Sequence, residues 1–369
     1  MILTALTFLV ILTVLVLIHE LGHFMMARWI GVRVEEFGLG LPPRIWGKKF
    51  GNTIYSLNWL PIGGFVRLAG EDDASSGQLS KIKGKLRPDQ RQKLGEYFWA
   101  RSKKERSVIL AAGVIMNFIL AVGITAALLV SGVKEPSGIV RVERIVAGSP
   151  AEKAGFQLND TLVSIAVRDQ KPMKLTTPAE LIAFVNEEKG NEVTLHVVRD
   201  GQDMNITVTP RKEVPPGEGP LGVAISDLET HKYTLTEAPG KAFMINIMRA
   251  KEMLVSLGST LWRLVTLRAP EADVAGPIGI AQVTGQAVKF GWQAVLEFAS
   301  ILSLNLAVLN ILPIPALDGG RLAFVFLEKI LGRRAHPAFE KSTHQIGMII
   351  LLGLVLLVSI NDILRLVRG

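Results

Sequence analysis

Residues 3–23 read LTALTFLVILTVLVLIHELGH, a run that is uncharged as far as Ile18 and ends in His19, Glu20 and His23. About 20 apolar residues in a helix cross the hydrocarbon core of a bilayer, so the run predicts a membrane span. Two histidines four residues apart share one helix face, and a glutamate beside the first can act as general base in a zinc hydrolase. Ionisable groups within a spanning helix are costly and therefore indicate a functional site.

The same three residues allow a plainer interpretation, because HExxH is short and recurs in unrelated proteins. They would then mark only the polar end of a signal sequence or an anchor helix. Against a signal peptide, no Lys or Arg precedes the run, and residues 24–29 do not form a small-residue cleavage site. A third metal ligand elsewhere in the chain would decide between the interpretations.

The composition is that of a membrane protein with a sizeable polar part. Hydrophobic residues make up 49% of the 369 residues and the mean hydropathy is +0.35, yet 20% of the residues are charged. The chain contains no cysteine, so a bound metal must be held by histidine and carboxylate side chains. The net charge of +8 would suit nucleic-acid binding, but its distribution favours membrane topology instead.

Four segments are long and apolar enough to span a bilayer, at about residues 3–27, 108–130, 295–312 and 346–360. Residues 28–106 contain 16 Lys or Arg against 8 Asp or Glu, whereas residues 131–292 contain 18 against 19. Positive charge favours the cytoplasmic side, so the first and third loops are predicted to be cytoplasmic and the large middle region extracytoplasmic. The HExxH residues then lie near the cytoplasmic end of the first span.

Residues 310–320, NILPIPALDGG, interrupt the third predicted span. Pro313 and Pro315 each remove a backbone donor and disfavour helix in the preceding residue, so the span must break there. Broken backbone at membrane depth is tolerated only where protein buries it or water reaches it. Asp318, followed by two glycines, is free to reach back as the third metal ligand.

Taken together, these motifs resemble the site-2 protease family of intramembrane zinc metalloproteases, in its bacterial RseP-like type with a single periplasmic PDZ domain. The resemblance rests on residues 19–23, 61–67, 276–280 and 310–320, which occur in family order. It implies that His19, His23 and Asp318 bind Zn²⁺, that Glu20 is the catalytic base, and that Asn310 helps to hold the substrate. Residues 112–117 depart from the family pattern, because relatives have Gly-Pro before Asn117.

The first loop is predicted to contain strands at residues 53–57 and 64–68 around a turn at residues 61–64. The resemblance implies a membrane-associated β element that pairs with an unwound substrate, with Gly63, Gly64 and Phe65 as substrate-binding residues. An ordinary cytoplasmic hairpin is the alternative. The basic residues between 74 and 106 are interpreted as attracted to anionic lipid, and nucleic acid is not expected as a partner.

The expected fold class is a polytopic α-helical membrane protein of about four transmembrane helices, with a cytoplasmic-side β element and an α+β PDZ domain. Its predicted domains are the first half of the protease core (1–135), the PDZ domain (136–227), an amphipathic helical linker (228–292) and the second half of the core (293–369). Residues 220–225 are the candidate peptide-binding loop of the PDZ domain, which acts either as a peptide receptor or as a size filter. His336 and His344 are expected at the surface.

The resemblance implies a metalloendopeptidase of the bacterial inner membrane, with its active site near the cytoplasmic side and its PDZ domain outside. Its expected substrates are transmembrane segments of single-span proteins, either anti-sigma factors or signal-peptide remnants, in regulated intramembrane proteolysis. A catalytically silent membrane scaffold that uses its PDZ domain is the alternative. A metal transporter is disfavoured, because the second and fourth spans offer almost no ionisable groups.

Overall fold

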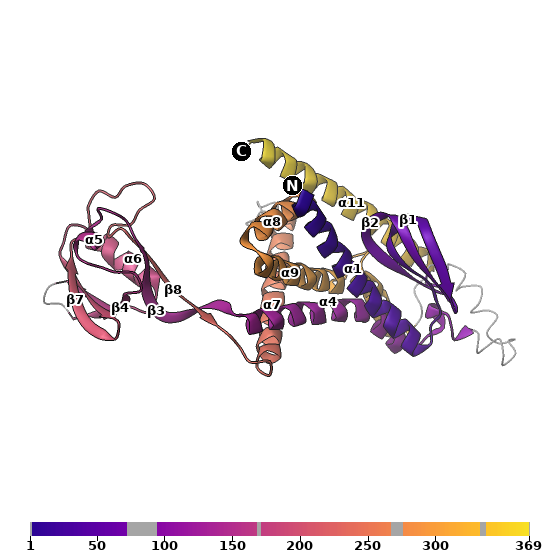
Figure 1. Cartoon of the computed structure of the whole chain (residues 1–369). Coiled ribbons are helices and arrows are strands. Elements are labelled where there is room, and N and C mark those ends of the chain that lie inside the picture. Colours follow the sequence, from indigo (N-terminus) through magenta and orange to yellow (C-terminus); the bar gives the residue numbers. More distant parts are fainter. Residues whose placement is uncertain (1, 72–93, 168–170, 267–275, 333–336, 369) are drawn as a thin grey trace. The chain divides into compact units, whose positions relative to one another are not determined.

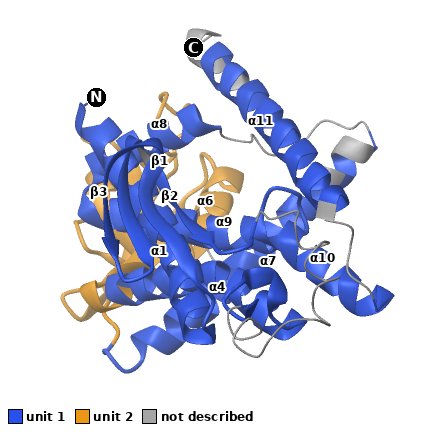
Figure 2. Cartoon of the chain, turned by 90° about the vertical axis from the view of Figure 1, so that its right-hand side faces the viewer, with its two compact units in different colours: residues 1–128, 234–369 blue, residues 129–233 orange. Residues whose placement is uncertain are grey.

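The computed structural model describes residues 2–71, 94–167, 171–266, 276–332 and 337–368. The chain divides into two compact units, residues 1–128 with 234–369, and residues 129–233 (Figure 2). The predicted basic segment lies partly outside the described residues, at 72–93, and so does His336. Each unit has its own hydrophobic core and is described separately.

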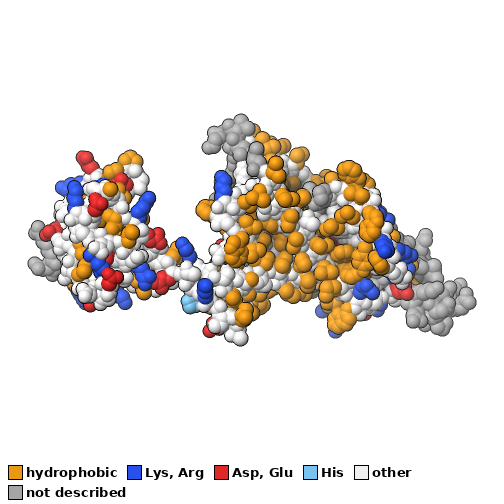
Figure 3. Space-filling view, viewed as in Figure 1, with side chains coloured by type: hydrophobic (Ala, Val, Ile, Leu, Met, Phe, Trp, Pro, Cys, Tyr) orange, Lys and Arg blue, Asp and Glu red, His pale blue; other side chains and the backbone are white. Residues whose placement is uncertain are grey.

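The first unit is built from long helices (Figure 1). Four of them are long and apolar enough to cross a membrane: α1 (Ile2–Ile30), α4 (Lys103–Ser131), α9 (Trp292–Ile311) and most of α11 (Pro337–Arg368). Hydrophobic side chains cover much of this unit's surface in Figure 3, as expected of a protein that faces lipid. The four predicted spans and the predicted mixed fold class are confirmed.

The remaining helices of this unit are shorter or more amphipathic. They are α7 (Ala238–Val265), α8 (Pro277–Phe290), α10 (Asp318–Leu331) and the short 3₁₀ helix η1 (Phe98–Ala100). Asn246 of α7 is fully buried and donates a hydrogen bond to Thr125 of α4 at 3.0 Å. The α7 helix therefore packs on the membrane bundle.

Helix α1 lies at the centre of the first unit because one of its faces is buried. Ile11 and Leu15 pack against α4 and α9, and His19 and His23 continue the same face at intervals of four residues. Small residues bring α4 and α9 together, since Ser300 donates to the Ala121 carbonyl at 3.0 Å and Ser303 to the Asn117 carbonyl at 2.8 Å. The two histidines are thereby held inside the bundle.

Strands β1 (Val34–Phe50) and β2 (Thr53–Leu68) form a sheet that packs against α1. Residues 53–57 and 64–68 are extended as predicted, but they belong to one bent strand and do not pair with each other as a hairpin. Phe37 of β1 has partners in both segments, Tyr55 and Val66. The predicted turn at residues 61–64 and the alternative of a hairpin around it are wrong, because these residues continue the strand. Both segments pair with β1 upstream, at residues 34–39, and residues 53–57 also pair with residues 46–50.

The second unit is an antiparallel sheet of order β7-β6-β4-β3-β8, with β5 paired to β4, and two short helices. Its elements are β3 (Val133–Ile145), α5 (Pro150–Lys153), β4 (Thr161–Val167), β5 (Met173–Lys174), α6 (Pro178–Glu187), β6 (Val193–Arg199), β7 (Gln202–Val208) and β8 (Val223–His231). Alternate residues of β6 face inward, so Val193, Leu195 and Val197 are fully buried. Within this sheet β8 is an edge strand.

Candidate metal centre and active site

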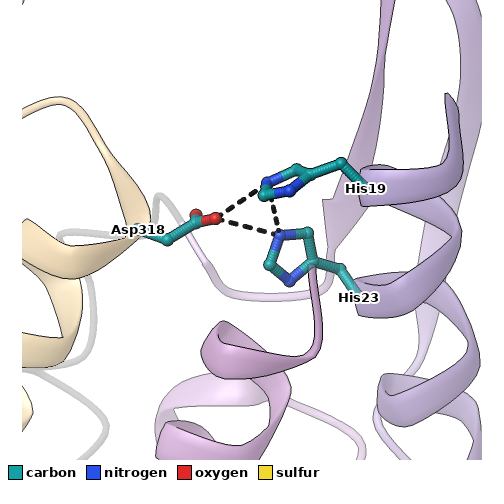
Figure 4. Close-up of side chains that lie close together, drawn as sticks. All are labelled: His19, His23 and Asp318. Carbon is teal, nitrogen blue, oxygen red and sulfur yellow. Dashed lines mark hydrogen bonds and ion pairs between the residues drawn. The ribbon is translucent and has the colours of Figure 1, made fainter. Parts of the chain in front are cut away.

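His19, His23 and Asp318 meet in the first unit although 295 residues separate the second histidine from the aspartate (Figure 4). One Asp318 oxygen, Oδ2, lies 2.9 Å from His19 Nε2 and 3.2 Å from His23 Nε2. The two Nε2 atoms are 3.2 Å apart, and ligand atoms of all three residues fall within 4.8 Å of one another. Among the described residues, this is the cluster that could hold a metal ion.

The break after α9 brings Asp318 to the histidines. Helix α9 ends at Ile311, Leu312 is extended, and α10 begins at Asp318 itself. The aspartate therefore projects from the first turn of a new helix, where backbone N–H groups have no partners within the helix and favour a negative side chain. The break that Pro313 and Pro315 predict is observed at this position.

Two glycines make room for the imidazole rings. A Cβ at Gly113 of α4 would collide with His23 Nε2 and would lie only 2.7 Å from His19 Cε1. A Cβ at Gly22 of α1 would collide with the backbone of Ala112. The α1 and α4 backbones can therefore approach closely where the rings lie.

A partner on the far side of its ring orients each histidine. The His23 Nδ1–H group donates to the Ile109 carbonyl at 2.8 Å, which leaves the Nε2 lone pair free to bind a metal. The His19 Nδ1 atom lies 3.4 Å from the amide of Asn117, a fully buried residue. In the sequence Asn117 stands out only as part of a divergent motif, and its place behind His19 was not predicted.

The donor set fits zinc. Two imidazole nitrogens and one carboxylate oxygen are zinc ligands of a catalytic type, in which a fourth position stays open. Both histidines are buried, and each has an outer partner of the kind that fixes ligand orientation in metal sites. Among the described residues the buried Asn117 Oδ1 atom has no hydrogen-bond partner, and rotation of this amide would let it accept from the His19 Nδ1–H group.

A cavity of about 230 Å³ opens beside the three residues. Glu20, Asn117 and Asn310 line it together with His19 and Asp318. A carboxylate and two side-chain amides therefore face the same space as the candidate ligands. The structure thus brings together five of the eight predicted site residues, namely His19, Glu20, His23, Asn310 and Asp318.

The three predicted residues of β2 do not line this cavity, although Gly63 and Gly64 lie close to residues that do. A Cβ at Gly63 would lie 3.6 Å from Val16 Cγ1, and one at Gly64 would lie 3.8 Å from Glu20 Cγ. Val16 and Glu20 both line the cavity and are one helical turn apart on α1. Because Gly63 and Gly64 have no side chains, the backbone of β2 passes close to α1 at this point. The Phe65 ring instead packs near Gly38 of β1 and beneath the Arg67 guanidinium.

The β sheet is tied internally by a buried carboxylate. Glu36 of β1 is 3% exposed, and Arg44 binds it at 2.6 Å while Arg67 lies 3.5 Å away. Burial opposes its ionisation, but the hydrogen bond and the charge of Arg44, with the charge of Arg67, hold the pKa of Glu36 below its ordinary value. The carboxylate therefore stays charged near neutral pH and links the two strands.

Known proteins resemble this chain over nearly its whole length. The profile of peptidase family M50 matches residues 7–354. The regulator of sigma-W protease RasP of Bacillus subtilis is 30% identical over 434 aligned positions, which cover 98% of this chain and 99% of the relative. Zinc metalloprotease RasP of Oceanobacillus iheyensis is 29% identical over 428 positions, with coverage of 98% and 99%.

Among solved structures, the PDZ domain of the carboxy-terminal protease from Vibrio cholerae matches 22% of this chain and 89% of its own, with 16% identity and a TM-score of 0.19. A score this low carries no weight. Residues 129–233 form an α+β unit by their own strand order and helices.

Proposed function

Because this chain belongs to peptidase family M50 and is a membrane metalloprotease, we propose that His19, His23 and Asp318 bind one zinc ion and that Glu20 is the catalytic base. The observation that carries the proposal is the cluster of three ligand atoms within 4.8 Å, beside a cavity that Glu20 also lines. The position of this cluster between candidate spanning helices supports cleavage at membrane depth.

A zinc ion held by these residues would supply Lewis acidity, which acidifies water and polarises the carbonyl of a bound peptide. Glu20 would take a proton from the attacking water and deliver it to the leaving amine. Ile109 and Asn117 hold the two imidazoles so that each presents Nε2 to the ligand position.

A transmembrane substrate must partly unwind before cleavage, because a helix buries its peptide bonds in its own hydrogen bonds. Asn310 lines the cavity and can bind the freed backbone there. The bare backbone at Gly63 and Gly64 passes the same helix face as Glu20 and can pair with an extended segment. These contacts would offset the hydrogen bonds that the substrate loses.

The second unit is proposed to be a PDZ domain that lies outside the cell membrane, with the active site near the cytoplasmic face. Its strand β8 is a sheet edge, and residues 220–225 include the start of that strand. An extended peptide can add to such an edge as a further strand. A role as a filter against bulky extracytoplasmic domains is the alternative.

The proposed substrates are single-span membrane proteins of a bacterial inner membrane, either anti-sigma factors or signal-peptide remnants. The relative from Bacillus subtilis is named a regulator of sigma-W protease, which supports a regulatory substrate of the first kind. A catalytically silent scaffold is the competing proposal. It would retain its function without His19, Glu20 or Asp318.

The test compares purified wild-type chain with Glu20→Gln and Asp318→Asn. We expect about one zinc ion per wild-type chain and per Glu20→Gln chain, with cleavage of a transmembrane peptide lost in Glu20→Gln by at least about 100-fold. Asp318→Asn should lose both zinc and cleavage, because it removes a charged ligand. Elemental analysis and mass spectrometry of the peptide measure the two results, and wild-type cleavage by Glu20→Gln would refute the assignment.

A further inference from the structure

The segment between α9 and α10 is the non-helical stretch that leads to Asp318. It comprises residues 312–317, and Ala316 within it has a φ of +78°, in the left-handed region that a residue with a Cβ rarely adopts. Within the segment the Ile314 N–H donates to the Leu312 carbonyl at 2.7 Å and the Leu317 N–H to the Ile314 carbonyl at 3.2 Å, but neither bond involves Ala316. A segment of this kind needs support from neighbouring elements to keep one conformation.

The segment also sits directly on the first turn of α10. A Cβ at Gly319 would collide with the Leu312 carbonyl oxygen, and one at Gly320 with the Ile314 carbonyl oxygen. These glycines let the segment fold back tightly against the helix that begins at Asp318. A shift of the segment must therefore shift Asp318 as well.

Helix α11 supplies the missing support. His344, which was expected at the surface, is half-buried, and its Nδ1 accepts a hydrogen bond from the Ala316 N–H at 3.0 Å. One turn further along α11, a Cβ at Gly347 would lie 2.9 Å from the Pro315 carbonyl carbon. One face of α11 thus holds the Pro315–Ala316 backbone by a hydrogen bond and by close packing.

The ring of His344 is fixed in the orientation that this bond requires. Its centroid lies 5.6 Å from that of Phe324 in α10. Since Nδ1 accepts, the ring proton of a neutral imidazole is on Nε2, and this buried Nε2 has no hydrogen-bond partner among the described residues. At this position the histidine therefore acts through its Nδ1 atom, which accepts from the Ala316 N–H group.

We propose that His344 is a positioning residue of the metal centre, which holds the left-handed Ala316 backbone and through it sets the position of Asp318. The proposal rests on the proposed zinc site but concerns a residue that touches neither zinc nor substrate. It makes α11 a part of the ligand framework as well as a membrane span.

The test uses the full chain in detergent with two substitutions of the same residue. His344→Asn keeps an acceptor at the position of Nδ1, whereas His344→Leu fills similar space without one. We expect His344→Leu to weaken zinc binding about tenfold, which corresponds to the net contribution of one hydrogen bond. The zinc affinity of His344→Asn should stay within about threefold of wild type. Chelator competition measures the zinc affinity.

A second measurement does not involve zinc. Hydrogen exchange of the Ala316 amide in zinc-free chain should be about tenfold faster in His344→Leu than in wild type and nearly normal in His344→Asn. Thr343→Val is the matched control, because the side-chain hydrogen bond of Thr343 in the described part of the chain stays within its own helix, to the Phe339 carbonyl at 2.8 Å. It should leave both measurements unchanged.

The outcomes separate the two proposals. Wild-type chain that binds no zinc would refute the metal site itself. If His344→Leu keeps the zinc affinity and the Ala316 exchange rate of wild type, the role of His344 alone is overturned. Equal losses of zinc affinity in His344→Leu and His344→Asn would also overturn it, because they would indicate that the ring acts by packing and not as an acceptor. If His344→Leu does not fold, Gly347→Ala tests the same face of α11, because its Cβ would press on Pro315. A folded Gly347→Ala chain with wild-type zinc affinity would overturn the proposed role of this face.

Discussion

Gly113 leaves the space that the two imidazole rings occupy. We predict that Gly113→Ala weakens zinc binding by about 10 to 100-fold, the range found when an outer partner of a metal ligand is lost, because the new Cβ displaces the rings of His19 and His23. Chelator competition on purified protein measures this effect. Gly123→Ala in the same helix is the control, since a Cβ there meets nothing within 4 Å.

An unchanged zinc affinity in Gly113→Ala would mean that α4 moves away from α1 without consequence for the site. The prediction is independent of catalysis, because it compares metal affinities only. A glycine in a helix normally weakens it relative to alanine, so a loss of function in Gly113→Ala cannot come from helix propensity.

Some residues of the candidate site could be predicted from the sequence and others could not. HExxH and the aspartate after the Pro-rich break identified candidate ligands, because helical spacing and metal chemistry limit the possibilities. Asn117 and His344 were not identified, since each acts across a contact between elements far apart in the chain. A buried asparagine in an apolar span was the available signal for the first.

At the scale of elements, α4 holds α10 by a buried ion pair between Arg106 and Glu328. Both side chains are at most 8% exposed, and Lys103 Nζ also donates to the Glu328 carbonyl at 2.7 Å. Because α10 begins at Asp318, this pair helps to fix the helix that carries the third candidate ligand.

We predict that Arg106→Met destabilises the chain by about 3–5 kcal/mol, because it leaves a buried carboxylate without its partner. The double variant Arg106→Met with Glu328→Met should recover most of this loss. Unfolding in detergent measures stability, and Arg249→Met, which breaks a partly exposed pair with Glu297, should cost less than about 1 kcal/mol. A double variant as unstable as the single one would contradict the prediction.

The β element shows a limit of local patterns. Alternation of side chains located the extended segments 53–57 and 64–68 correctly. Pairing depends on which backbone lies alongside: residues 34–39 pair with both segments, and residues 46–50 pair with residues 53–57. No local pattern indicates a partner upstream, so a turn was predicted at residues 61–64, which instead lie within β2.

At the scale of the whole molecule, the second unit is inserted between α4 and α7 with its two ends adjacent. The Tyr233 N–H donates to the Leu129 carbonyl at 3.1 Å. The unit also has a core of its own, around β3, β4 and β6. Such an insertion can be removed without stretching the rest of the chain.

We predict that replacing residues 129–233 by a short Gly-Ser linker leaves zinc content at about one ion per chain and retains cleavage of a bare transmembrane peptide. Elemental analysis and the peptide assay test this. Faster cleavage of a substrate with a bulky folded outer domain would identify the unit as a filter, and slower cleavage as a receptor. Loss of zinc would contradict the independence of the two units.

The sequence by itself determined the spanning helices, the break in the third span and the identity of the candidate ligands, because apolar length, proline chemistry and helical spacing act locally. Only the tertiary structure decided how Asp318 reaches the two histidines, how glycines 22 and 113 admit their rings, and how Asn117 and His344 support the site. Those features depend on distances between helices far apart in the chain, which packing sets and no local pattern encodes.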